Sequence, residues 1–338
     1  MITYIIMSLK SKLLYDFGLI KLRYWQKNRK YLKPLYDDLG SPSEHPGRII
    51  YMCDGRFKTG GLGDRLHGII SLYLFCKEHG LEFKVNFCDP FILQEYLEPN
   101  QYDWHIDSND LQYNLSAVEP ILIACSFREN NGTLEQELAL QLKYLRGKIQ
   151  ATKGKEFHIY TNMHYAHTAD IYSKNFHELF KPSKALFDAL EVQKKHIGNQ
   201  YISVTLRFQN LLGDFQEGKY PTLDDISQKK LIQKVRNKII ELHNTRHPDA
   251  KFLVTSDSRR FLDAVTDIDY IYTIPGKLVH MTYTPIHDFA THLKSFVDLM
   301  MLADAQKLYL LVTDQMYHSG FAESASFINC RPYEVVEW

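Results

Sequence analysis

A glycine-rich loop is the first stretch of this sequence whose residue types could do chemistry. Gly60, Gly61 and Gly63 lie between a strand-like run and an apolar pattern with helical spacing. Glycines let a backbone approach phosphate oxygens closely, and a helix N-terminus favours negative charge. The segment CDGRFKTGGLGDRLHGII (53–70) therefore predicts a phosphate cradle, but its glycines alone do not identify the substrate.

The loop also contains a carboxylate. Asp64 is a candidate general base if the loop faces a substrate. The simpler alternative is an N-terminal cap for the helix that begins near Arg65, because Asp fills that role well.

Arg207 follows the apolar run YISVTL, where a long cation is otherwise unexpected. A guanidinium offers a planar fork of donors that suits phosphate oxygens, and it stays charged at any relevant pH. An exposed arginine leaving an edge strand is the alternative.

Two further strand ends carry hydroxyl and carboxylate groups. Ser256, Asp257 and Ser258 follow the run KFLVT, and Ser319 follows KLYLLVT at the start of another helical pattern. Such residues cap helices, but the same groups could line a nucleotide pocket.

Alternating strand and helix patterns must position these residues. Helical patterns cover 62–80, 134–148, 180–198, 229–247 and 292–304. Strand-like runs are expected at 48–52, 82–90, 120–127, 156–162, 201–208, 251–257, 270–275 and 307–313.

This order predicts an α/β protein with two Rossmann-like, doubly wound halves that face a cleft. We expect a basic N-terminal segment and linker at 1–44, an N-terminal Rossmann-like domain at 45–195 and a C-terminal one at 196–338.

The overall composition excludes some functions. The 338 residues carry 40 basic and 40 acidic side chains, so net charge gives no case for nucleic-acid binding. The five cysteines include no CxxC pair, which indicates reduced thiols in a cytoplasmic protein. His158, His164 and His167 are clustered without a carboxylate pattern, so no metal site is expected.

The first 35 residues are strongly basic, with eight Lys or Arg against one acid. Leu9, Leu13, Phe17, Ile20 and Tyr24 recur with helical spacing, but no run is long enough for a transmembrane helix. The segment either lies on an anionic membrane surface or docks on the body of the protein with a solvated basic face.

Taken in order, four stretches resemble the superfamily of GDP-fucose-dependent fucosyltransferases, which includes the α1,2-, α1,6-, nodulation and protein O-fucosyltransferases. GGLGDRLHGIISLYLF is similar to its N-terminal glycine motif, ISVTLRFQNLLGD to its HxRxGD motif, and FLVTSDSRRFL to its second motif. The third motif corresponds to the segment ending in YHSGFAESA, with Ser319, Gly320 and Phe321 as its S-x-F element. The resemblance spans roughly residues 48–328.

The resemblance implies a GT-B fold and an inverting, metal-independent transfer of L-fucose from GDP-fucose to a glycan. The C-terminal domain would hold the nucleotide sugar and the N-terminal one would receive the acceptor. Arg207 would be the catalytic cation, with Asp64 as the candidate base. Substrate-binding residues would be Gly60, Gly61, Gly63, Arg65, Ser256, Asp257, Ser258, Ser319, Gly320 and Phe321. A lipid-linked oligosaccharide acceptor in bacterial surface polysaccharide assembly would suit a peripheral basic N-terminus.

Two other functions compete with this one. Thr205 and Phe208 depart from the family pattern, where His and a second Arg are common, and Gly213-Asp214 comes late. These departures would fit a non-catalytic nucleotide-sugar-binding relative. An NAD(P)-dependent oxidoreductase would also begin with strand, glycine loop, helix and strand, with Asp89 as its ribose-binding acid, but the third glycine of that fingerprint is missing.

Overall fold

The computed structural model describes residues 24, 26–58, 60–123, 133–215, 220–279 and 288–338. The chain forms two compact units. Unit 1 contains Met1–Asp89 and Pro99–His167, and unit 2 contains Pro90–Glu98 and Thr168–Trp338. Compactness alone does not test the predicted domains 1–44, 45–195 and 196–338, which stay a prediction.

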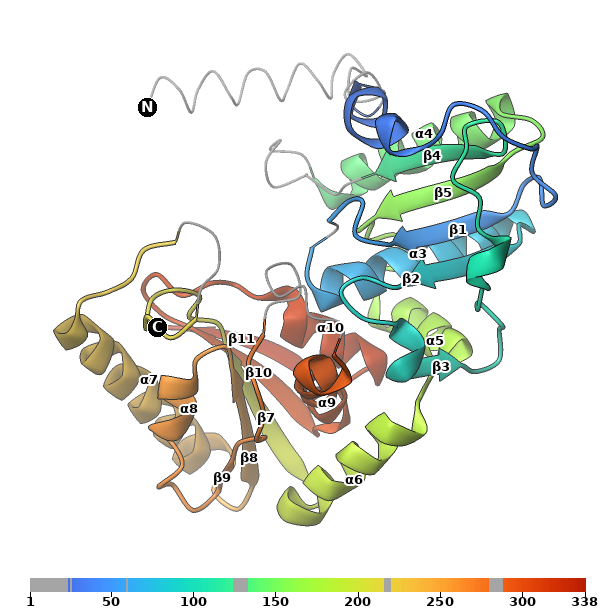
Figure 1. The fold of residues 1–338 in the computed structure, drawn as a ribbon. Helices are drawn as coiled ribbons and strands as arrows, with labels where there is room; N and C mark the ends of the chain where they lie inside the picture. Colours follow the sequence, from blue (N-terminus) through green and yellow to red (C-terminus); the bar gives the residue numbers. More distant parts are fainter. Residues whose placement is uncertain (1–23, 25, 59, 124–132, 216–219, 280–287) are drawn as a thin grey trace. The chain divides into compact units, whose positions relative to one another are not determined.

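Unit 1 is built on a four-stranded parallel sheet in the order β2-β1-β5-β4. Its strands are β1 (Ile49–Cys53), β2 (Phe83–Phe87), β4 (Val118–Ile123) and β5 (Glu156–Thr161). The helices are α3 (Leu62–His79) and α4 (Leu134–Ala151), with short turns η1 (Asn28–Leu32), η2 (Lys33–Leu35) and η4 (Ser108–Asp110). Figure 1 draws this unit with its strands side by side.

Helix α3 packs against the sheet through a glycine. A Cβ atom on Gly68 would lie 2.3 Å from the carbonyl oxygen of Thr161 and 3.0 Å from the Tyr51 ring. Any side chain here would push the helix off β5, since buried packing leaves little free space. Gly68 thus allows α3 to lie close to β5. In the dinucleotide-binding fingerprint the third glycine allows this approach, and in this sequence Leu66 occupies that position.

The described part of the N-terminal segment docks on unit 1. The Asn28 side-chain carbonyl accepts the backbone N–H of Leu122 at 2.6 Å, and its amide donates to the Leu122 carbonyl at 3.3 Å. The Tyr24 hydroxyl donates to Glu137 at 2.7 Å. Residues 24 and 26–36 therefore pack on strand β4 and helix α4, while residues 1–23 and 25 lie outside the described part of the chain, and with them most of the predicted amphipathic helix.

Unit 2 is built on a five-stranded parallel sheet in the order β11-β10-β7-β8-β9. The strands are β7 (Tyr201–Leu206), β8 (Lys251–Ser256), β9 (Ile271–Tyr272), β10 (Lys307–Val312) and β11 (Tyr333–Glu337). In Figure 1, α7 (Asp225–Arg246) and α8 (Arg259–Asp263) lie on one side of this sheet, and α9 (Phe289–Asp304) and α10 (Gly320–Ile328) on the other. The unit is doubly wound, as predicted.

A smaller layer completes unit 2. Strands β3 (Leu97–Pro99) and β6 (Phe180–Pro182) pair beside the turn η3 (Leu93–Glu95) and helices α5 (Ala169–Leu179) and α6 (Lys184–Ile197). Tyr96 stacks on Phe296 of α9 with ring centroids 4.2 Å apart, which ties residues 90–98 to this unit. Strands β3 and β11 and helix α5 were not predicted, and β6 occupies the first residues of the helical pattern predicted at 180–198, so α6 begins only at Lys184.

Candidate functional site

Arg207 follows β7, the central strand of the unit 2 sheet. Its side chain is 21% exposed, so part of the guanidinium reaches the surface. The guanidinium carbon lies 5.5 Å from the centre of the Phe215 ring, and Nε lies 3.3 Å from a carboxylate oxygen of Asp257. Arg207 therefore leaves a central strand, and the expected alternative of an edge strand is wrong.

Asp257 fixes the loop that carries this arginine. Its two oxygens accept the backbone N–H groups of Phe208 and Gln209, each at 2.8 Å. Burial raises the pKa of Asp257 above its ordinary value, while the Arg207 cation and the two N–H donors act in the opposite direction. Gln209 has φ +53°, a left-handed conformation that this carboxylate helps to hold. The structure gives Asp257 a positioning role toward Arg207.

The two neighbouring serines cap the start of α8. Ser258 Oγ accepts the N–H of Phe261 at 3.1 Å and donates to the Asp214 carboxylate at 2.9 Å. Asp214 also accepts the N–H of Arg260 at 2.7 Å. Ser256 Oγ accepts the N–H of Ser258 at 3.1 Å. Asp214, whose alignment with the family motif was uncertain, therefore supplies the negative charge at this helix start.

The third strand end joins the same edge of the sheet. Ser319 Oγ accepts the N–H of Phe321 at 3.3 Å and so caps α10. Tyr317, just before it, donates its backbone N–H to the Arg207 carbonyl at 3.0 Å. An ideal Cβ on Gly320 would meet no described atom within 4 Å, so packing within the described residues does not require glycine there. Loops after β7, β8 and β10 thus meet around Arg207.

The departures from the family pattern have structural explanations. The Phe208 ring is fully buried and lies 5.0 Å from the ring of Phe261. Thr205 shares a hydroxyl–hydroxyl hydrogen bond of 2.9 Å with Thr255 on β8. Both residues belong to the interior of unit 2, and neither displaces Arg207.

The glycine loop lies at the carboxyl end of β1 in unit 1. Gly60 has φ +98°, and a Cβ there would lie 2.5 Å from Oδ2 of Asp64. That same oxygen accepts the N–H of Gly61, the N-cap residue of α3, at 3.0 Å. Gly63 lies in the first turn of the helix, where it is buried. The helix begins at Leu62 rather than near Arg65, so Asp64 lies in its first turn and binds the N–H of the N-cap residue instead of being the N-cap itself. A base role stays a prediction.

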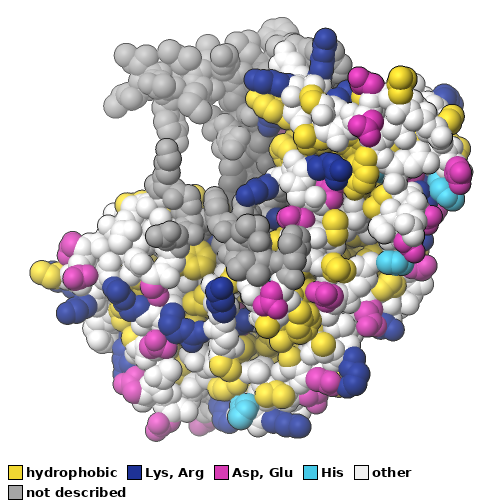
Figure 2. All heavy atoms as spheres, viewed as in Figure 1, with side chains coloured by type: hydrophobic (Ala, Val, Ile, Leu, Met, Phe, Trp, Pro, Cys, Tyr) yellow, Lys and Arg dark blue, Asp and Glu magenta, His cyan; other side chains and the backbone are white. Residues whose placement is uncertain are grey.

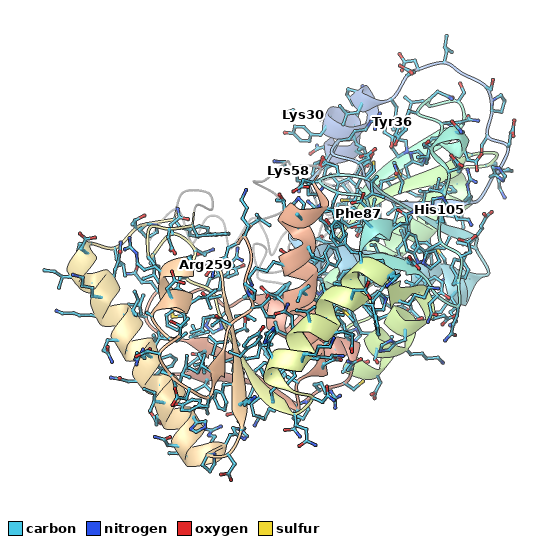
Figure 3. All side chains as sticks on the ribbon, turned by 60° about the horizontal axis from the view of Figure 1, so that its bottom comes forward. Lys30, Tyr36, Lys58, Phe87, His105 and Arg259 are labelled. Carbon is cyan, nitrogen blue, oxygen red and sulfur yellow. The ribbon has the colours of Figure 1, made fainter. Side chains whose placement is uncertain are left out.

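Arg65 is buried under this loop, with 3% of its surface exposed. Nε donates to the Gly60 carbonyl at 3.0 Å and Nη1 to the Asp89 carbonyl at 3.1 Å, and the guanidinium lies 5.5 Å from the Phe87 ring centre. Figure 3 labels Phe87 at this end of the unit. The backbone of Asp89, the predicted ribose-binding acid, therefore helps to hold the glycine loop.

Sequence reasoning missed a chain of polar groups inside unit 1. Glu156, His158 and Tyr160 alternate along β5 and so share one face of the strand. Arg48 binds Glu156 through Nη2 at 2.8 Å, and His158 Nδ1 lies 3.0 Å from the Tyr36 hydroxyl.

The chain continues to the carboxyl end of the sheet. The hydroxyls of Tyr36 and Tyr160 are 3.1 Å apart, and Tyr160 donates to Asp54 at 3.2 Å. Burial lowers the pKa of His158, although the Glu156 carboxylate 3.6 Å away partly offsets this. In the segment EFHIY (156–160), polar residues alternate with apolar ones, and this pattern could have revealed the polar chain.

The three clustered histidines have separate environments. His158 lies within β5, His164 stacks on His67 at 4.2 Å between ring centroids, and His167 Nδ1 lies 2.9 Å from the Tyr165 carbonyl. In the parts of the chain that the structure describes, no group of three or more His, Cys, Asp or Glu could hold a metal ion.

The two sets of predicted site residues fall in different units. Arg207, the residues Ser256–Ser258 at the end of β8 and the start of α10 meet in unit 2, whereas the glycine loop and Arg65 belong to unit 1. Each set is described by itself. The predicted meeting of both sets across a cleft stays a prediction.

Other surface features are unspecific. On the face drawn in Figure 2, positive and negative side chains are interspersed. Within the described ranges, no helix has the length and apolar character needed to cross a bilayer.

Comparison with solved structures identifies the fold. NodZ alpha-1,6-fucosyltransferase co-crystallized with GDP matches with a TM-score of 0.53 at 12% identity, over 82% of this chain and 91% of that one. The same enzyme soaked with GDP-fucose gives 0.52 at 12% identity, over 83% and 92%. Fucosyltransferase NodZ from Bradyrhizobium gives 0.51 at 12% identity, over 82% and 91%.

No protein-family model and no curated protein sequence gives a significant match to the chain. The structural similarity confirms the GT-B-like α/β fold that the motifs predicted.

Proposed function

We propose that this protein is a glycosyltransferase that moves L-fucose from GDP-fucose to a glycan acceptor with inversion and without a metal. The observation that carries the proposal is Arg207, a partly exposed cation at the end of the central strand of unit 2, where three strand ends meet. In parallel α/β sheets, ligands bind outside the carboxyl ends of the strands. The NodZ structures with the same fold were obtained with GDP or GDP-fucose.

The chemistry requires a fixed positive charge at the leaving group. As the bond to the sugar breaks, GDP gains charge on its β-phosphate while the sugar becomes oxocarbenium-like. A preorganised cation stabilises that separated charge more than it stabilises the bound donor, and this difference lowers the barrier. Arg207 takes this role, held by Asp257 against the loop after β7.

The remaining predicted residues have supporting roles in the proposal. The open space at Gly320 and the capped start of α10 leave room for donor groups beside Ser319 and Phe321. The backbone around Ser256 and Ser258 would form the neighbouring side of the proposed donor site. Glycines of the unit 1 loop and Arg65 would meet the acceptor side, with Asp64 as the candidate base.

A nucleotide panel tests the proposal. GDP, UDP, ADP, CMP and NAD are compared by thermal shift on the full chain, and GDP is expected to stabilise it most. A ligand at 100 times its dissociation constant adds about 2.7 kcal/mol of stability. Equal shifts with all five compounds, or a preference for NAD, would contradict the proposed donor.

Transfer itself needs a separate assay. Release of GDP from GDP-fucose in the presence of glycan acceptors is the expected activity, and tight GDP binding without release or transfer would identify a non-catalytic binder. A lipid-linked acceptor at a membrane surface is part of the proposal. Deletion of residues 1–23, which spares the part that packs on β4, tests it, because unchanged binding to anionic liposomes would remove its physical basis.

A further inference from the structure

We propose that unit 1 contains a preformed anion-binding site centred on Arg56, which binds a phosphate or carboxylate group carried by the acceptor. Arg56 lies three residues after β1, at the carboxyl end of the unit 1 sheet. Its role in transfer depends on the proposed function, whereas anion binding at this residue does not.

The guanidinium of Arg56 is held on one edge and one face. Nη1 donates to Oδ2 of Asp54 at 2.8 Å, and the backbone N–H of Arg56 donates to Oδ1 at 3.2 Å. The guanidinium carbon lies 3.7 Å from the centre of the Tyr113 ring. Two supports fix a side chain that would otherwise lose rotamer entropy on binding, so less free energy is spent when an anion arrives.

Asp54 is fully committed to the protein. It is 2% exposed, and besides Arg56 its Oδ2 accepts the hydroxyls of Tyr113 at 3.1 Å and Tyr160 at 3.2 Å. Four donors share its negative charge, so the carboxylate does not fully neutralise the guanidinium. Tyr160 continues into the buried chain through Tyr36 to His158, which anchors Asp54 in the sheet. Figure 3 labels Tyr36 within this unit.

Arg56 has donors that no described residue takes. Of the five N–H donors of a guanidinium, Asp54 accepts one, and no other described residue is hydrogen-bonded to this group. Among the described residues, Asp54 is the one carboxylate within ion-pair distance of Arg56. One third of the side chain is exposed, 33%, so its remaining edge is accessible. The neighbouring carboxylate raises the pKa of Arg56 against the opposing effect of burial, which keeps the cation charged.

The exposed part of the Arg56 side chain offers the donor geometry that an anion requires. Planar, bidentate recognition of phosphate or carboxylate is the interaction for which arginine is best suited.

The experiment measures binding of inorganic phosphate to the full chain by calorimetry. Arg56→Gln is expected to weaken phosphate binding about tenfold or more, the effect of losing a charge-assisted hydrogen bond. Arg56→Lys keeps the charge without the fork and is expected to lose most of the same affinity. Arg146→Gln, which removes an exposed arginine of α4 in the same unit, is the matched control and should change nothing.

A double variant guards against misfolding. Arg56→Gln alone leaves the buried Asp54 carboxylate without its cation, so Asp54→Asn/Arg56→Gln is measured beside it. GDP affinity is measured on every variant and is expected to stay within about twofold, because the donor is assigned to unit 2. If GDP affinity falls by the same factor as phosphate affinity, the anion belongs to the donor and the proposal is overturned. Unchanged phosphate binding in both Arg56→Gln variants, or none in the wild type at millimolar concentration, would also overturn it.

Transfer assays then address the acceptor. Matched sugars with and without a phosphate or carboxylate group are offered with GDP-fucose, and the wild type is expected to prefer the anionic member of each pair. Arg56→Gln should abolish that preference while leaving transfer to the neutral member unchanged. An equal preference in both proteins would contradict the acceptor assignment. A chain that binds phosphate through Arg56 but shows no GDP binding would instead refute only the proposed function.

Discussion

The carboxylate of Asp257 lies 3.3 Å from Nε of Arg207, and it joins the ends of two neighbouring strands. The same carboxylate accepts two backbone N–H groups from the loop that begins at Arg207. The position of the cation is therefore determined by a residue on the next strand.

Asp257→Asn tests this relationship. The amide keeps one acceptor but turns an NH2 group toward an N–H donor, so we expect a stability loss of about 1–3 kcal/mol and a fall in kcat larger than the change in KM. Urea unfolding and steady-state kinetics check it. Asp314→Asn, which breaks an exposed pair with Lys234, is the control and should cost about 1 kcal/mol or less. Equal effects of the two substitutions would contradict the positioning role.

Arg207→Ala is expected to lower fucosyl transfer about 100- to 1,000-fold, because it removes a preorganised charge that would face the leaving GDP. Arg207→Lys should recover little of this, since lysine lacks the planar fork. Turnover of GDP-fucose is measured beside the melting temperature. Near-normal turnover in the folded alanine variant would exclude Arg207 from catalysis.

Asp64 can be separated into its two roles. Asp64→Asn keeps a carbonyl that can accept the Gly61 N–H, so we expect it to retain stability, whereas Asp64→Ala should lose about 0.5–2 kcal/mol as a cap is removed. If the carboxylate also takes the acceptor proton, Asp64→Asn lowers turnover about 100-fold or more at unchanged stability. Wild-type turnover in that variant would leave Asp64 as a cap alone.

Gly68→Ala should destabilise unit 1 by about 1–3 kcal/mol, because its Cβ would collide with the Thr161 carbonyl. Gly147→Ala in α4 has no described atom within 4 Å of the new Cβ and should stabilise the helix by about 0.5–1 kcal/mol. Denaturant midpoints give both values, and the opposite signs distinguish close packing from helix propensity.

The buried polar chain along β5 predicts that the free energy of unfolding falls as the pH becomes acidic. The pKa of His158 is below its ordinary 6.5 in the folded state, so the folded protein binds fewer protons there than the unfolded chain. The contribution of His158 to the free energy of unfolding is therefore complete above pH 6.5. It is lost as the pH falls below that value, by up to about 1.4 kcal/mol per pH unit.

Glu156 adds a second loss at lower pH. Its pKa is below 4.5 despite burial, because His158 and Arg48 stabilise the carboxylate. Its stabilising effect is present above pH 4.5 and decreases as pH falls through the folded-state pKa. Unfolding free energies measured from about pH 7 to about pH 5 should decline less steeply in His158→Gln than in the wild type. Parallel profiles would show that His158 does not titrate between these limits.

Much of the fold followed from local patterns. The apolar runs around Tyr51, Val204 and Val254 became central parallel strands, since buried parallel strands read as continuous hydrophobic segments. The short β3 and the exposed β11 escaped notice because neither contains such a run. Helix α5 is short, but its buried residues Tyr172, Asn175, Phe176 and Leu179 recur at helical spacing, so the sequence carried a signal for it that was overlooked.

The sequence indicated which residues belong to the candidate site, but it did not indicate what each residue does. Arg207 stood out because a cation ended an apolar strand, and the structure places it at the edge where ligands of parallel sheets bind. Asp257 was expected to touch the nucleotide, yet both its oxygens bind the chain itself. Arg56 passed unnoticed, because an arginine in a loop is ordinary until its partners are known.

The sequence by itself determined the main alternation of strands and helices, the glycine loop before α3 and the arginine that follows β7. These depend on periodicity and on neighbours within a few residues. Only the tertiary structure decided which carboxylate holds Arg207, and that Gly68 allows the close approach of α3 to β5. The reason is that strand order brings together residues about 50 to 100 positions apart, and no local pattern records that pairing.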